Sequence, residues 1–572
     1  MSTLVGALCG SREARALVLS RLVRGRRELV EFEVPGAHAC GFVCAPRLLA
    51  AAPGASDDGI APVVALEGYV LDAAATACLE QGAAAERVIA TYREAGAAGF
   101  AAFGGNFAFA LLDAQRRVWL VRDAAGCKPL FTAEAADAWI FGSSALETAR
   151  LAQGRATLTR AALASFLRTG RAALAGETPL RGVLPVPAGH SLLLSSCGID
   201  RSLSQRVARE NHPSLDLNEA AEALWTQLSA VVAAQGGMHR LASALSGGLD
   251  SSSILAARSA HEESPRAYSF CHGHAGLPAA WNEREFAEQA TEKCGADTRY
   301  VGLAAAELPT LLAATCQAQD FPFGSPVVLA QGHLFRCAAD EGVSRLLSGH
   351  GPDTLFGGGT SHLISRGADL LASGRVPAAW RLLAGGRHYA EVPVVRLAAS
   401  TLVLLARAPA GSRLQRELDA QLYDTIVPVS LITEECNARA CGIDNRQPYL
   451  ERGVLALAAR MAPEAVLPGD GETKAVLRRA VAGRLPATIL ARRRAIGFAV
   501  PALPWLLELA PWVDSQWTAM RALPGVQDPP LHEVRARLAS GGPAAWGTAF
   551  TVWRRLILAA WMETHDVQLE AA

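Results

Sequence analysis

A seven-residue stretch, SGGLDSS at residues 246–252, combines the residue types that bind phosphate groups. Gly247 and Gly248 lack a Cβ atom, so their backbone can approach a ligand closely and adopt positive φ. An apolar run that predicts a strand precedes them, and an alanine-rich run that predicts a helix follows. In open α/β sheets, ligands bind at such turns, at the carboxyl ends of the strands.

The polar side chains of this stretch favour a nucleotide phosphate bound together with a cation. The N–H groups of the first helical turn and the hydroxyls of Ser246, Ser251 and Ser252 can donate to phosphate oxygens. The stretch lacks the lysine of a Walker loop. Because Asp250 would repel a phosphate, it is predicted to bind Mg²⁺. A glycine turn in which Asp250 only caps the helix is the alternative that the stretch alone leaves open.

Charge and hydropathy exclude several classes of protein. The 572 residues include 54 Lys and Arg against 54 Asp and Glu, so no net charge attracts the chain to nucleic acid or to an anionic membrane surface. The longest apolar run, residues 397–406, is shorter than the roughly 20 residues that cross a bilayer. We expect a buried helix there, no transmembrane segment and a cytoplasmic location. The twelve cysteines lack metal-site spacing, and most are predicted to be small buried apolar residues.

The order of the predicted elements indicates an α/β protein with two domains. Up to about residue 200, short apolar runs bounded by Gly, Asp or Pro predict a β-rich domain, assigned to residues 1–205. A polar linker that contains Asn211, Pro213 and Asp216 then leads to a capped helix. In residues 218–572, strands alternate with helices, which predicts a doubly wound parallel sheet, and the segment beyond about residue 370 is mostly helical.

The SGGLDSS stretch resembles the pyrophosphate-binding loop of the ATP pyrophosphatase superfamily, and in particular its asparagine synthetase branch. A later stretch, SGHGPD at residues 348–353, resembles the second loop of those enzymes, with Asp353 as the second Mg²⁺ ligand beside Asp250. The family usually has Asp-Glu where this chain has Asp353-Thr354. The resemblance implies ATP and Mg²⁺ as cofactors. The residues predicted to line the nucleotide are Leu245, Ser246, Gly247, Gly248, Asp250, Ser251, Ser252, Phe270, Ser348 and Gly349.

Two further blocks resemble the same family and add candidate catalytic residues. The stretch GIDNRQPYLE, residues 442–451, resembles the family's G-I-E-x-R-x-P-F-L-D segment. Lys474 matches the lysine of its K-x-x-L-R motif and could stabilise developing pyrophosphate, with an exposed helix charge as the alternative. Where the family commonly has a further lysine, this chain has Ala495, so Arg494 becomes a candidate. His350 could deprotonate an incoming amine or merely line the nucleotide pocket.

The first domain resembles the family's glutaminase domain, an Ntn-type fold, but in degenerate form. Residues 105–131 carry the resemblance. The catalytic N-terminal cysteine is replaced by Ser2, and a hydroxyl is a far weaker nucleophile than a thiolate. The glutamine-binding turn has become LEGYVLD, residues 66–72. Glutamine hydrolysis is therefore predicted to be lost, with the domain kept as a structural platform and another amine as the acceptor.

The retained motifs imply an AMP-forming, ATP-dependent carbon–nitrogen ligase. Family members without the cysteine include β-lactam synthetases and lasso peptide macrolactam synthetases. β-Lactam synthetases have a tyrosine where this chain has His350, and His388, Tyr389 and Glu391 are only loose candidates for the tyrosine–glutamate pair. The sequence thus favours a lasso cyclase that joins an Asp or Glu side chain of a leader-processed ribosomal peptide to its N-terminal amine.

Partners and alternatives follow from that interpretation. A lasso cyclase would work with a leader peptidase and a leader-binding protein. The enzymatic alternatives are an ammonia-dependent asparagine synthetase and a β-lactam synthetase. A non-catalytic scaffold that retains the fold is the alternative of another class.

Overall fold

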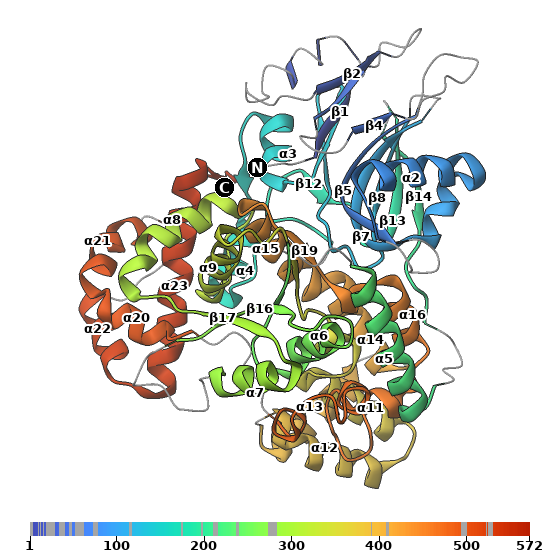
Figure 1. Cartoon of the computed structure of the whole chain (residues 1–572). Helices are drawn as coiled ribbons and strands as arrows, with labels where there is room; N and C mark the ends of the chain where they lie inside the picture. The colour runs from blue at the N-terminus through green and yellow to red at the C-terminus, as the bar shows by residue number, and fades with distance from the viewer. Residues whose placement is uncertain are drawn as a thin grey trace.

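The chain was analysed as a computed structural model (Figure 1). The structure describes residues 4–9, 11, 13–14, 17–18, 29–33, 40–44, 49–51, 62–71, 78–113, 117–172, 176–195, 198–209, 215–235, 240–272, 283–390, 392–407, 411–493, 500–521, 523 and 530–571. Within these ranges the fold is α/β, with a β-rich N-terminal part followed by a parallel sheet and many helices, as predicted.

Two antiparallel sheets form the N-terminal part. The first has the order β12 (Val183–Pro185), β9 (Phe131–Ala135), β10 (Ala138–Gly142), β1 (Val5–Cys9), β3 (Cys40–Cys44) and β2 (Leu29–Glu33). The second has the order β14 (Gly198–Ser204), β13 (His190–Ser195), β8 (Val118–Arg122), β7 (Gly104–Leu112), β5 (Val63–Leu71) and β4 (Leu49–Ala51), with β6 (Cys78–Glu80) also paired to β5.

Side-chain alternation along the strands packs these sheets face to face between helices. In β1, Leu8 joins the core between the sheets, whereas Val5 and Ala7 join a core that includes α3 (Ala145–Gln153) and α4 (Arg160–Thr169). On the far side of the second sheet, Phe109 packs in one cluster with Ile89 of α2 (Gln81–Ala95). The result is a helix, sheet, sheet, helix arrangement, with η1 (Gly96–Ala102) beside α2.

The predicted capped helix after the linker is α5 (Leu217–Ala234). The Asp216 carboxylate accepts hydrogen bonds from the N–H groups of Asn218 and Glu219, and Glu219 accepts from the N–H of Asp216. This capping box satisfies backbone donors that the first helical turn leaves unpaired. The local sequence therefore fixes where α5 begins.

A five-stranded, all-parallel sheet organises the second part of the chain. Its order is β17 (Asp297–Val301), β16 (Arg266–Phe270), β15 (Leu241–Ala244), β18 (Arg345–Leu347) and β19 (Asp444–Arg446). Leu241 and Leu347 pack with helices on one face, and Ala242 and Leu346 pack with helices on the other. The sheet is therefore doubly wound, and its strand order reverses between β15 and β18.

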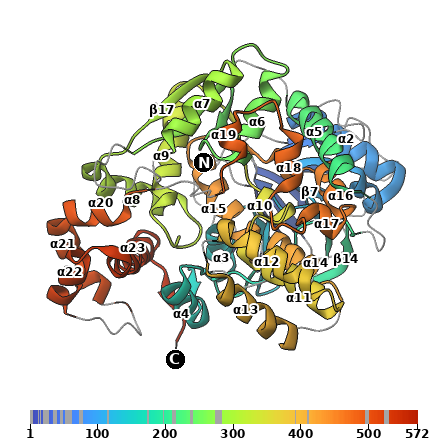
Figure 2. The same cartoon turned by 90° about the horizontal axis from the view of Figure 1, so that it is seen from below.

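Helices surround this sheet (Figure 2). Those before β19 are α6 (Leu249–Ser259), α7 (Arg284–Cys294), η4 (Ala305–Glu307), α8 (Leu308–Ala318), α9 (Val327–Asp340), α10 (Pro352–Leu355), α11 (Thr360–Ala372), α12 (Val376–Ala390), α13 (Val394–Arg407), α14 (Arg413–Ala420), η5 (Gln421–Thr425) and α15 (Val427–Ala440). After β19 come η6 (Pro448–Leu450), α16 (Arg452–Ala459), α17 (Pro463–Val466), α18 (Ala475–Ala480), α19 (Ala487–Leu490), α20 (Ala502–Glu508), α21 (Ala510–Arg521), α22 (Leu531–Ala539) and α23 (Gly542–His565). The chain then returns to the N-terminal part, where β20 (Gln568–Leu569) pairs with β11 (Thr157–Leu158).

The apolar run at residues 397–406 forms a helix, α13, but the prediction that this helix is buried is wrong. Leu397 and Thr401 are buried, whereas Val395, Leu402 and Val403 are exposed. The reason is that α13 packs against the body of the protein through one face only, mainly on α11. No single helix among the described residues is long and apolar enough to cross a membrane. Only α12 and α13 together pass by length and composition, with a bend of 118°.

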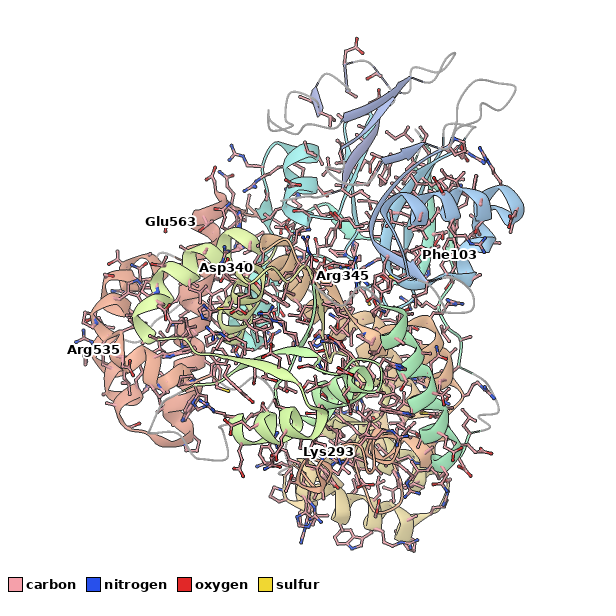
Figure 3. All side chains as sticks on the ribbon, viewed as in Figure 1. Phe103, Lys293, Asp340, Arg345, Arg535 and Glu563 are labelled. Carbon is pink, nitrogen blue, oxygen red and sulfur yellow. The ribbon has the colours of Figure 1, made fainter. Side chains whose placement is uncertain are left out.

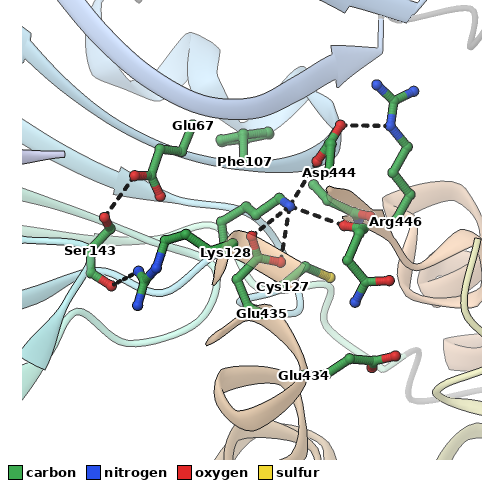
Figure 4. Close-up of polar contacts among 12 residues, drawn as sticks. Glu67, Phe107, Cys127, Lys128, Ser143, Glu434, Glu435, Asp444 and Arg446 are labelled. Carbon is green, nitrogen blue, oxygen red and sulfur yellow. Dashed lines mark hydrogen bonds and ion pairs between the residues drawn. The ribbon is translucent and has the colours of Figure 1, made fainter. Parts of the chain in front are cut away.

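A buried lysine joins the two parts of the chain (Figure 4). Lys128 Nζ lies 3.0 Å from both carboxylate oxygens of Glu435 and 2.8 Å from Asp444 Oδ1, and it donates to Asn445 O at 3.0 Å. Burial alone would lower the pKa of Lys128, but the Asp444 and Glu435 carboxylates outweigh it and raise that pKa. Burial raises the pKa of Glu435 to about 7 against the opposing effect of Lys128.

Replacing this lysine tests how far the interface depends on it. Lys128→Met leaves two buried carboxylates without their cation, so we expect the free energy of unfolding to fall by about 3–5 kcal/mol in urea denaturation. Lys293→Met, at an exposed position of α7 (Figure 3), is the control and should change stability by less than about 0.5 kcal/mol.

The loss should also depend on pH. Burial would raise the pKa of Asp444, but Lys128 and Arg446 outweigh it and hold that pKa below its usual range. Without Lys128, the folded-state pKa values of both carboxyl groups rise, and that of Glu435 moves further above its unfolded value. The variant therefore loses stability as the pH rises from the unfolded to the folded pKa of Glu435. We expect the difference from wild type to be larger near about pH 8 than near about pH 5. A loss that is small and constant with pH would contradict the role given to Lys128.

Candidate active site

The two glycine-rich loops meet at the switch point of the parallel sheet. The first loop leaves β15 and enters α6, and the second leaves β18 and enters α10. A Cβ atom on Gly349 of the second loop would lie 3.0 Å from Ser251 N of the first. The loops are therefore in direct contact, at the edge of the sheet where this fold class holds its ligands.

Hydrogen bonds within the first loop hold its turn. Ser246 N donates to Ser251 Oγ at 3.1 Å, and Gly248 N donates to Ser246 Oγ at 3.3 Å. Gly247 has φ +76°, and a Cβ atom there would lie 2.6 Å from Ala287 N of α7. Only glycine fits this position, because a side chain would meet both backbone strain and the neighbouring helix.

Lys474 lies between the two predicted metal ligands. Its Nζ atom is 2.7 Å from Asp250 Oδ2 and 2.8 Å from Asp353 Oδ1. The Lys474 side chain is 7% exposed, whereas that of Asp353 is 67% exposed, so the cluster opens to solvent on the Asp353 side. Lys474 is thus no exposed helix charge, which was the alternative from the sequence.

Burial sets the ionisation of this cluster. It raises the pKa of Asp250 to about 6, with Lys474 opposing the rise and Asp353 adding to it. Burial would lower the pKa of Lys474, but Asp250 and Asp353 outweigh it and raise that pKa. The lysine is therefore held as a cation at neutral pH.

The backbone around the cluster is unusually constrained. Lys474 has φ +54°, a left-handed conformation that costs a non-glycine residue roughly 1–2 kcal/mol. Its N–H donates to Phe356 O at 3.1 Å, and Gly358 N donates to Asp353 O at 2.7 Å. A Cβ atom on Gly358 would lie 2.1 Å from Asp353 Oδ1 and 2.6 Å from Lys474 Cε. Strain of this kind concentrates at functional sites.

Two buried polar atoms beside the cluster have no hydrogen-bond partner among the residues that the structure describes: Asp250 Oδ1 and Ser252 Oγ. Such atoms are costly to bury unless a ligand satisfies them. The carboxylate oxygen suits a cation, and the hydroxyl suits a phosphate. Among the described residues, no group of three or more His, Cys, Asp or Glu side chains could hold a metal ion. Two carboxylates nevertheless fit Mg²⁺, which proteins commonly bind through one or two carboxylates together with substrate phosphates.

The remaining predicted residues differ in their surroundings. Ser348 Oγ donates to Glu434 Oε1 of α15 at 2.7 Å, so this hydroxyl already has a partner. Leu245 is buried directly before the first loop, and Phe270 ends β16 next to it in the sheet. His350 is half-buried, and within the described ranges its side chain has no hydrogen bond or ion pair.

Several predicted residues cannot be placed. Arg494, Ala495, Glu391 and Ser2 lie outside the described residues. Their roles stay predictions.

The structure adds one residue that the motifs did not single out. Arg492 Nη2 lies 2.6 Å from Glu283 Oε1, and Nη1 lies 3.4 Å from Gly247 O. This buried arginine brings a cation to the phosphate loop from a segment 245 residues away. The run of arginines at residues 492–494 was the available signal, but it does not show which of them faces the loop.

Two protein families match long segments of this chain. The family described as asparagine synthase matches residues 228–563, which is more than half of the chain. The chain belongs to the asparagine synthase family. A second family, described as a glutamine amidotransferase domain, matches residues 73–203. This asparagine synthase family protein therefore combines the two halves that the sequence predicted. The family assigns to it ATP-dependent formation of amide bonds.

Individual proteins add little to this assignment. No curated protein matches the chain. The allosteric regulatory enzyme of purine biosynthesis is similar at 11% identity over 53% of this chain and 90% of its own, with a TM-score of 0.24. Glutamine phosphoribosylpyrophosphate amidotransferase from B. subtilis is similar at 11% identity over 61% of this chain and 82% of its own, with a TM-score of 0.23. Likenesses with TM-scores this low carry no weight for function.

A matched pair of glycine variants tests the geometry of the cluster. Gly358→Ala places a methyl group against Asp353 and Lys474, so we expect it to weaken ATP binding at least tenfold, or about 1.4 kcal/mol. Gly469→Ala, whose added methyl group meets nothing within 4 Å, should bind ATP like wild type. The measurement is the rise in melting temperature at increasing ATP and Mg²⁺ concentrations. Equal rises in both variants would show that the cluster does not contact the nucleotide.

Proposed function

We propose that this asparagine synthase family protein is a lasso peptide cyclase. In this proposal it adenylates an Asp or Glu side chain of a ribosomal peptide and joins it to the peptide's own N-terminal amine. The observation that carries the proposal is the cluster of Asp250, Lys474 and Asp353 beside two unpartnered buried atoms. In the same chain, a serine occupies the position at which the family's glutaminase domain has its nucleophilic cysteine.

The first step activates the carboxylate. One of its oxygens attacks the α-phosphorus of ATP, the bond to the bridging oxygen breaks, and pyrophosphate leaves. Lys474, Arg492 and the Ser252 hydroxyl are the groups of this chain that can stabilise the departing charge. Mg²⁺ held by Asp250 and Asp353 would further neutralise the phosphates.

The second step forms the ring. The peptide's amine attacks the acyl carbon, the new C–N bond forms, AMP leaves, and the amine loses a proton. His350 is the proposed proton acceptor, because it lies in the second loop and its ring forms no hydrogen bond or ion pair with another described residue. Because both groups belong to one peptide, holding them together gives the reaction a large effective concentration.

The contacts of Glu67 support an amine source other than glutamine. Glu67 belongs to the altered LEGYVLD segment and lies within strand β5. Its Oε1 accepts hydrogen bonds from Leu4 N at 2.8 Å and Ser143 Oγ at 2.7 Å. A carboxylate is thus placed at the start of β1. Together with a serine in place of the family's cysteine, this change of sequence disfavours ammonia release from glutamine.

The proposal also specifies partners and location. The substrate is a peptide whose leader has been removed, so a leader peptidase and a leader-binding protein would deliver it. The reaction uses cytoplasmic ATP, which is consistent with a cytoplasmic protein.

Mass spectrometry separates this function from its alternatives. The protein is incubated with ATP, Mg²⁺ and either a candidate leaderless peptide or aspartate with ammonium. We expect the peptide to lose one water, with AMP and pyrophosphate formed in equal amounts. Asp250→Ala should lower this rate by about 10²-fold or more.

Lys293→Ala, on the exposed surface of α7, is the matched control and should cyclise the peptide at the wild-type rate. Asparagine in the second reaction would instead identify an ammonia-dependent asparagine synthetase. ATP binding without any product from a panel of peptides would support the scaffold alternative.

A further inference from the structure

Helices α12 and α13 form a hairpin, Val376–Ala390 and Val394–Arg407, at the edge of the molecule (Figures 1 and 2). Both helices pack on α11 and on each other. Ala379, Leu382 and Leu383 of α12 and Leu397 of α13 are buried. The surfaces of α12 and α13 that point away from α11 therefore belong to one outer face of the protein, here called the hairpin face.

Large apolar side chains are exposed on the hairpin face. Val395 is 72% exposed, Leu402 58% and Trp380 54%, with Val376 and Val403 also above half. Along α13, Val395, Leu402 and Val403 recur at the spacing of one helical face, and the small exposed residue Ala399 lies between them. In the described structure, nine large hydrophobic residues are exposed, and five of them lie on this one hairpin. Such a gathering indicates a surface that contacts another apolar phase.

The charge of the hairpin is as uneven as its hydropathy. Residues 375–407 contain five arginines and a single acidic residue, Glu391, although the whole chain is electrically neutral. Of these arginines, Arg381, Arg396 and Arg407 are exposed and form no ion pair within the described structure. The hairpin face is therefore both apolar and strongly basic, a combination that suits an anionic interface.

We propose that the hairpin face docks on a lipid bilayer surface that carries anionic headgroups. The two helices together have the length and composition of a membrane span, and they are bent by 118° at the break between them. An amphipathic pair of this kind lies in the interface, with apolar side chains among the lipid tails and arginines at the headgroups.

Docking would place the active site close to the membrane surface. Tyr389 at the end of α12 lies under the Arg478 guanidinium, which is 5.5 Å from its ring centroid. Arg478 Nε in turn donates to Thr473 O, the residue before Lys474, at 2.9 Å. The hairpin is thus connected to the Lys474 segment through two contacts. This inference does not depend on which amine the enzyme uses.

Vesicle co-sedimentation of the full chain tests the inference. The protein is mixed with vesicles of phosphatidylcholine alone, or of phosphatidylcholine with phosphatidylglycerol. We expect binding to the anionic vesicles only, weakening as salt is added. The charge variant R381Q/R396Q/R407Q should lower this affinity by about fivefold for each arginine removed.

A second variant tests the apolar part. V395S/L402S/V403S should lose binding to the anionic vesicles at least tenfold, because the serines remove apolar area that would be buried in lipid. L507S, at an exposed leucine of α20, is the matched control and should bind like wild type. All three variants should keep the wild-type rise in melting temperature with ATP, which shows that the fold is intact.

Three outcomes would overturn the inference. Wild-type protein could remain in the supernatant with both kinds of vesicle. The wild type and every variant could sediment with the anionic vesicles to the same extent, which would locate the contact elsewhere. The wild type could ignore vesicles yet bind polyglutamate in a way that R381Q/R396Q/R407Q abolishes, which would identify the hairpin face as a site for an acidic protein.

Discussion

A single ammonium group, Lys474 Nζ, holds together the parts of this protein that approach the nucleotide loops. It lies between Asp250 of the first loop and Asp353 of the second. These three residues come from distant parts of the chain, and a cation between two carboxylates favours the charged form of both. The left-handed backbone at Lys474 and the absent side chain at Gly358 are the local consequences of that arrangement.

The same physical device recurs at the boundary between the two parts of the chain. Lys128 is also buried and also lies between two carboxylates, those of Glu435 and Asp444. Glu434, which precedes Glu435 on α15, accepts a hydrogen bond from Ser348 of the second loop. The N-terminal part therefore contacts the helix and strand that support the nucleotide loops. This contact gives a physical reason to retain the glutamine amidotransferase-like domain, whatever its own chemistry.

The switch point and the α12–α13 hairpin differ in how their charged and apolar groups are placed. Around the switch point, charged groups are paired, with Lys474 buried between two carboxylates, and backbone hydrogen bonds hold the loops. On the hairpin of α12 and α13, charged and apolar groups are exposed together, and the helices are held from one side only. The nucleotide loops and the hairpin face therefore lie on separate elements. The contact of Tyr389 with Arg478 lies between them.

The sequence by itself determined the local elements and the kinds of chemistry they carry. Short apolar runs predicted the strands on both sides of the linker, and SGGLDSS predicted a phosphate loop at a strand end. Asp216 and Glu219 encode the start of α5. These features depend on residues within a few positions of one another. The family resemblance, which rests on four such short blocks, was confirmed by the match over residues 228–563.

Only the tertiary structure decided which distant side chains meet. It paired Arg492 with Glu283 beside the first loop, gave Ser348 its partner Glu434, and made a fifth strand of residues 444–446. It also left α13 exposed, where apolar composition alone predicted burial. The physical reason is that short-range patterns set backbone conformation, whereas burial and ion pairing depend on what the rest of the chain brings to the other side.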